Sequence, residues 1–163
     1  MFYAIARFIR GFSYAFKGIG KCICSERNMR FHLSSIVLVL YWCCFFQPTA
    51  PELALIVLCF GAVCALEAVN TAAEALCDRI GKEHHPLLGL AKDAAAGGVL
   101  LMAIASAACG LIIFLQPPRF MTAVTAIFTS PLWCGILIAL VISAFWFVLL
   151  CPTTSRNCSD KKE

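Results

Sequence analysis

The fold is decided by one stretch of the chain, Leu53-Ala-Leu-Ile-Val-Leu-Cys-Phe-Gly-Ala-Val-Cys-Ala-Leu66-Glu67-Ala-Val-Asn70-Thr-Ala-Ala-Glu74-Ala-Leu-Cys-Asp78. An apolar run passes into a polar segment without a break, which predicts one membrane helix. Glu67, Asn70, Glu74 and Asp78 lie at i, i+3, i+7 and i+11, so an α-helix would place them in one stripe. Ionisable groups are costly in a membrane helix and usually serve a function. The stripe therefore indicates a buried polar site, a metal site, or both.

The rest of the chain is also strongly apolar. Of its 163 residues, 61% are hydrophobic, and the mean hydropathy is +0.87. These values are too high for a soluble domain of this size and indicate an integral membrane protein. We expect an all-α helical bundle with four spans, at about Arg30–Phe46, Leu53–Cys77, Leu87–Leu115 and Leu132–Cys151. Prolines fall between these spans and indicate helix boundaries.

Basic residues indicate how the spans are oriented. They precede the first span, lie between the second and third, and follow the fourth, whereas the segment Gln47–Glu52 contains none. Arg119 is the one basic residue on the other side. Because cytoplasmic loops carry the excess of Lys and Arg, both termini are predicted to be cytoplasmic.

The segment Met1–Cys24 predicts an amphipathic helix ahead of the first span. Phe8, Phe12, Phe16 and Ile19 share one helical face, and the basic residues lie largely off that face. This pattern is typical of a helix that lies on an anionic lipid surface. A helix packed on the bundle would show the same pattern, and the two interpretations are compatible.

A second polar group surrounds the expected turn between the second and third spans. It comprises Asp78–His85 and the sequence Ala91-Lys92-Asp93-Ala94. Lys92 could bind phosphate as a point charge, or the segment could be a solvated loop. The chain contains no G-x-x-x-x-G-K-[ST] motif, and its eleven cysteines have no zinc-ligand spacing. The residues alone indicate a small polytopic membrane protein with a carboxylate site at its cytoplasmic face.

Four motifs resemble those of the bacterial diacylglycerol kinase and undecaprenol kinase family. They are Ser13–Gly18, Ser25–His32, Glu67–Ile80 and Ala91–Gly97. The resemblance covers Phe12 to about Leu115. It implies a three-span protomer in a homotrimer, with active sites between protomers near the cytoplasmic surface of the inner membrane. The fourth span lies beyond the family pattern, so we expect a kinase domain at 1–118, an extra loop and span at 119–151, and a polar cytoplasmic tail at 152–163.

The resemblance also implies roles for the matching residues. Glu67 corresponds to the catalytic base, and Glu26 and Glu74 correspond to Mg²⁺-binding carboxylates. The remaining matches are implied contacts to ATP or its phosphates: Tyr14, Asn70, Glu83, His84, His85, Lys92 and Asp93.

The activity implied is ATP-dependent phosphorylation of a membrane lipid alcohol. The form Glu26-Arg27-Asn28 favours undecaprenol, with diacylglycerol as the alternative. A small channel or transporter that uses the Glu67 and Glu74 stripe is a different class of protein, and no inverted repeat supports it. A lipid phosphatase would need signatures that are absent from the chain. No nucleic-acid partner is expected.

Overall fold

The computed structural model describes residues 2–80 and 85–150, and these residues form helices without strands. The order is α1 (Phe2–Ser25), α2 (Arg27–Phe46), α3 (Ala50–Ile80), α4 (Pro86–Phe114), α5 (Pro117–Phe128), α6 (Pro131–Phe145) and the π-helical turn η1 (Trp146–Leu150). Four of these segments are long and apolar enough to cross a membrane: Arg27–Phe46, Ala50–Ile80, Pro86–Phe114 and Pro131–Leu150. The predicted all-α fold and its four spans are confirmed. The expected tail at 152–163 lies outside the described residues.

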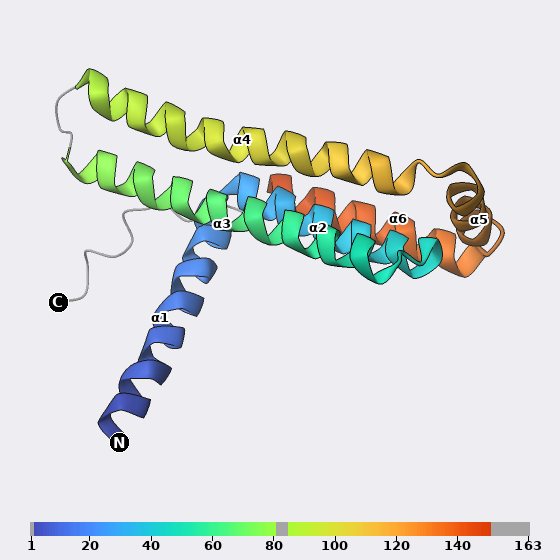
Figure 1. Cartoon of the computed structure of the whole chain (residues 1–163), viewed down its shortest axis with the longest axis horizontal. Helices are drawn as coiled ribbons and strands as arrows, with labels where there is room; N and C mark the ends of the chain where they lie inside the picture. Colours follow the sequence, from blue (N-terminus) through green and yellow to red (C-terminus); the bar gives the residue numbers. More distant parts are fainter. Residues whose placement is uncertain (1, 81–84, 151–163) are drawn as a thin grey trace.

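The spans differ in length, and this difference defines two ends of the bundle. α3 and α4 are the longest helices and pack along each other, with α2 against α3 and α6 beside α2 (Figure 1). α2 has 20 residues, which at 1.5 Å per residue is about the thickness of the hydrocarbon core. α3 has 31 residues and continues well past the start of α2 (Figure 1). We name the two ends of the bundle the α1 end and the α5 end.

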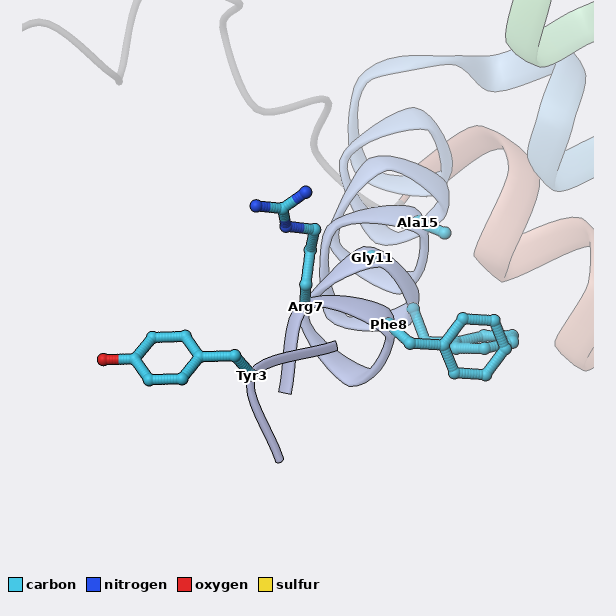
Figure 2. A pocket seen from close by; sticks show the side chains of 6 residues that line it. Tyr3, Arg7, Phe8, Gly11 and Ala15 are labelled. Carbon is cyan, nitrogen blue, oxygen red and sulfur yellow. The ribbon is translucent and has the colours of Figure 1, made fainter. Parts of the chain in front are cut away.

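α1 joins the bundle through its last turns and then leaves it at an angle (Figure 1). The contact there includes Cys22, whose Sγ lies 3.1 Å from Thr71 Oγ1. An open hollow of about 780 Å³ runs along the free part of α1, where Tyr3 and Phe8 point to opposite sides of the helix (Figure 2). The polar groups that line this hollow do not converge on one point. The segment is helical, as α1 shows, and its role as an amphipathic helix on a lipid surface stays a prediction.

The segment between the third and fourth spans differs from the expected loop. It forms α5, which lies across the end of the other helices (Figure 1). Its prolines at the start explain the difference, because proline fits the first turn of a helix as well as it fits a loop. Ala123 is fully buried in a cluster with Phe46 of α2, Ile56 of α3 and Ile113 of α4. The extension is therefore part of the hydrophobic core.

Candidate active site

The first part of the polar stripe of α3 faces the bundle interior. Glu67 is 1% exposed and Asn70 is 6% exposed, whereas Asp78, farther along the helix, is exposed. The same face carries the buried residues Ile56 and Val63 nearer the α5 end. One face of α3 thus changes from apolar to polar along its length, and Glu67 is the first charged group after the change.

Glu67 is a buried carboxylate without a hydrogen bond from the described residues. Neither of its oxygens has a partner there with full hydrogen-bond geometry, although the Asn28 side chain lies near enough to interact. The charges of Glu26 and Glu74 act on it unfavourably. An unsatisfied buried polar group costs free energy and is rare in native proteins. A group of this kind calls for an explanation beyond packing.

Asn70 and Glu74 continue the cluster toward the end of α3. Asn70 Nδ2 donates to Glu74 Oε1 at 3.0 Å, while Asn70 Oδ1 is buried without a partner in the described chain. Thr71 Oγ1 donates to the carbonyl of Glu67 at 2.9 Å and also contacts Cys22 of α1. The end of α1 therefore helps to hold this part of α3.

Glu26 reaches the cluster because it occupies the bend between α1 and α2. Its backbone is extended, with φ −107° and ψ 121°, and its side chain does not cap α2. The bend places this carboxylate close enough to Glu67 for the two charges to repel each other. Sequence spacing alone could not predict this proximity, because the two residues belong to different helices.

Lys92 and Asp78 form an ion pair across α3 and α4 at the rim of the cluster. The Lys92 side chain is 39% exposed, and it also interacts with the charge of Glu74. This arrangement offers a cation to a ligand that approaches from the end of the α3–α4 pair. Asp93 is exposed on the neighbouring position of α4.

Other predicted residues are not brought into the cluster. Tyr14 is 70% exposed on the part of α1 that leaves the bundle. His85 caps α4, where its Nδ1 accepts a hydrogen bond from the backbone N–H of Leu87 at 3.3 Å. Glu83 and His84 lie outside the described residues.

Arg30 is a buried cation that residue type alone does not mark as functional. It is 2% exposed, and its Nη1 donates to the carbonyl of Phe147 in η1 at 3.4 Å. It lies one helical turn after Glu26 in the motif Ser25–His32, and this spacing is the feature of the sequence that points to it. The contact shows that the fourth span ends beside the start of α2.

The fit of the cluster to Mg²⁺ depends on its oxygen donors. In residues 2–80 and 85–150 no group of three or more His, Cys, Asp or Glu side chains is arranged to hold a metal. Mg²⁺ usually keeps several waters and binds through one or two carboxylates together with substrate phosphates. Glu26, Glu74 and the unpartnered Asn70 Oδ1 fit an ion that arrives with a nucleotide.

The fold and this cluster together define a polytopic membrane protein with a polar site toward the α1 end of its bundle. Residues 13–114 match the family described as prokaryotic diacylglycerol kinase. The chain belongs to this family and is a lipid kinase, a class of transferase. The family match ends at the last residue of α4, so α5, α6 and η1 lie beyond it.

Three relatives show how far the similarity extends. The undecaprenol kinase of Bacillus subtilis (strain 168) is 40% identical over 109 residues, which is 67% of this chain and 89% of that protein. The diacylglycerol kinase of Synechocystis sp. is 36% identical over 107 residues, covering 65% and 61%. The diacylglycerol kinase of Escherichia coli (strain K12) is 32% identical over 98 residues, covering 60% and 80%. No solved structure matches the chain.

Proposed function

We propose that this lipid kinase transfers the γ-phosphoryl group of ATP to the hydroxyl of a membrane lipid alcohol, with undecaprenol as the preferred substrate. The observation that carries the proposal is the position of Glu67. Its buried carboxylate has no hydrogen bond in the described chain, and it lies at the level where α1 meets α2. A lipid hydroxyl at the membrane surface would reach this level while its chain stays in the bilayer.

Glu67 has the role of general base in this proposal. The lipid hydroxyl gives its proton to a Glu67 oxygen as its own oxygen attacks the γ-phosphorus. A new O–P bond forms, the bond from that phosphorus to the β–γ bridging oxygen breaks, and ADP leaves. Phosphoryl transfer asks little covalent chemistry of the protein, so the main task is to place the two substrates in line.

The residues around Glu67 would bind the nucleotide. When bound, Mg²⁺ would neutralise charge on the phosphate oxygens, and Glu26 and Glu74 are the residues that would hold it. Lys92 would attract phosphate by its charge and would exchange part of its pairing with Asp78 for that contact. Asn70 would orient Glu74 through their hydrogen bond. Contacts from Asp93, Tyr14 and the segment Glu83–His85 remain part of the proposal.

The proposed orientation places the α1 end at the cytoplasmic face of the inner membrane. The α3–α4 pair would then project into the cytoplasm, where ATP is available. In the proposed homotrimer, residues 1–118 form the kinase domain and a neighbouring protomer completes the nucleotide site. This arrangement would explain why Tyr14 is exposed in the single chain.

The substrate preference rests on two observations. The form Glu26-Arg27-Asn28 precedes the first span, and the relative with 40% identity is an undecaprenol kinase. The test supplies purified protein with γ-labelled ATP and either undecaprenol or diacylglycerol in vesicles. Faster labelling of undecaprenol is expected. Faster labelling of diacylglycerol contradicts the preference, and labelling of neither lipid contradicts the proposed reaction.

A further inference from the structure

An apolar groove of about 480 Å³ lies between α2 and α4, with α3 as its floor. Its floor includes Ile56, Cys59 and Val63, and its wall on α2 includes His32. On α4 the lining runs from Ala103 to Phe114, which at 1.5 Å per residue is about 16 Å of helix. The groove therefore covers part of the thickness of a hydrocarbon core of roughly 30 Å.

The floor of the groove lies on the same face of α3 as the carboxylate cluster. Val63 is buried on the same face of α3 as Glu67, and the two residues are one helical turn apart. One end of the apolar groove thus lies one helical turn from a buried carboxylate without a hydrogen bond in the described residues. This arrangement fits an amphiphile whose hydroxyl lies at Glu67 and whose chain runs toward the α5 end.

The other end of the groove is lined by Phe120, which belongs to α5. Its ring packs against the ring of Trp42, with 5.4 Å between the centroids. The helix that carries Phe120 is held by the fully buried Ala123 and by the bonds of Arg119 to Glu52 at 2.9 and 3.0 Å. Phe120 is thus a fixed wall, and it lies outside the part of the chain that matches the family.

We propose that the groove holds the part of the lipid chain nearest the hydroxyl, and that Phe120 ends the groove and sets how much of that chain is accommodated. The inference rests on the proposed function, which it extends by naming a specificity-determining residue in the extension. A chain longer than the groove would turn out into the bilayer at Phe120. Because bilayer lipid is as apolar as the groove, any discrimination would come from packing contacts.

The first test measures kcat/KM for lipid alcohols that share one head group and differ in chain length. The wild type should show a rise that levels off at the length where the chain reaches Phe120. Phe120→Ala should move the plateau to longer chains, and Phe120→Trp should move it to shorter ones. Phe120→Leu keeps more of the contact with Trp42 and covers the case in which Phe120→Ala does not fold. Phe128→Ala is the matched control, because Phe128 is 63% exposed on the same helix.

The second test measures binding without turnover. The chain has three tryptophans, so Trp133→Phe with Trp146→Phe leaves Trp42 as the fluorophore beside Phe120. Lipid alcohols with bromine at the chain end should quench Trp42 most strongly at the length that fills the groove. A variant that keeps only Trp133 should show no such maximum.

The two tests separate this inference from the proposed reaction. A plateau at the same length in the wild type and in the folded Phe120 variants overturns the inference. Turnover without a length-dependent maximum in the quenching of Trp42 also overturns the inference. That result is expected if a helix of a second copy of the chain fills the groove. A quenching maximum in a protein that phosphorylates no lipid alcohol supports the groove and contradicts the proposed function.

Discussion

Two glutamates on α3 have opposite surroundings. Glu52, at the α5 end, accepts hydrogen bonds from both terminal nitrogens of Arg119, from Gln116 Nε2 at 3.1 Å, and from the backbone N–H and hydroxyl of Thr49 at 2.7 and 2.9 Å. Glu67, toward the α1 end, accepts none from the described residues. The difference separates a carboxylate that holds the structure together from one that is available to a substrate.

Arg119 is the residue that completes the structural group. It donates to the backbone carbonyl of Gln47 at 2.9 Å and to Gln116 Oε1 at 2.9 Å, and its guanidinium lies 4.2 Å from the centre of the Phe46 ring. The hydrogen bond to Glu52 raises the pKa of Arg119, so the charge is always present. Arg119 is a single basic residue on its side, so the excess of Lys and Arg on the other side is consistent with the proposed orientation.

The largest expected effect is on Glu67. Glu67→Gln should lower turnover by about 10²–10⁴-fold, the usual contribution of a general base. The variant should fold and insert normally, because it removes a buried charge without a hydrogen bond in the described chain. Labelled phosphate transfer and thermal unfolding are the measurements. Glu52→Gln is the matched control on the same helix, and it should keep its turnover while it loses stability.

Near-normal turnover in Glu67→Gln would remove this residue from the mechanism. A strong loss of turnover in Glu52→Gln, with the protein still folded, would contradict the division between the two glutamates.

The second effect concerns Mg²⁺. Loss of a group that orients a metal ligand costs about 10–100-fold in metal affinity. Glu74→Ala and Glu26→Ala would each remove a ligand itself. Each variant should therefore raise the Mg²⁺ concentration for half-maximal activity by at least a similar factor. A titration of activity with Mg²⁺ at saturating ATP measures the change. Glu52→Gln should have the same midpoint as the wild type. The assignment is wrong if both alanine variants also share that midpoint.

A shortened chain tests whether the site at the α1 end functions without the helices beyond α4. Every residue assigned to the reaction precedes α5, so a chain that ends at Pro118 should keep measurable lipid kinase activity. Its stability should fall, because Ala123 is lost and its packing contacts with the cluster of Phe46, Ile56 and Ile113 are lost with it. Activity and thermal unfolding are measured in the same detergent. A folded, inactive short chain would show that the extension contributes to the site.

The sequence predicts the helices and the stripe of α3 well, because both depend on local periodicity. It predicts the environment of single residues less well. Pro117 and Pro118 do not distinguish a loop from the start of α5, since proline is common in both. The proximity of Glu26 to Glu67 depends on the bend at the end of α1, and the pairing of Arg119 with Glu52 depends on how α5 crosses the bundle. Tertiary packing decides each of these contacts.

The smallest expected effect is on the pair formed by Glu52 and Arg119. Arg119→Ala and Glu52→Ala should each lower the midpoint of thermal unfolding by a few degrees. The double variant should unfold at about the same midpoint as the less stable of the two single variants, because the two residues act on each other. Arg119→Lys should recover part of the loss, since lysine keeps the charge and lacks the planar fork that reaches both oxygens of Glu52. Thr122→Ala, on an exposed site of α5, is the control and should change the midpoint least. Turnover below the unfolding temperature should stay close to wild type in all of these variants. If the two alanine substitutions are instead additive, Glu52 and Arg119 stabilise the protein independently, and their pairing does not hold α5 in place.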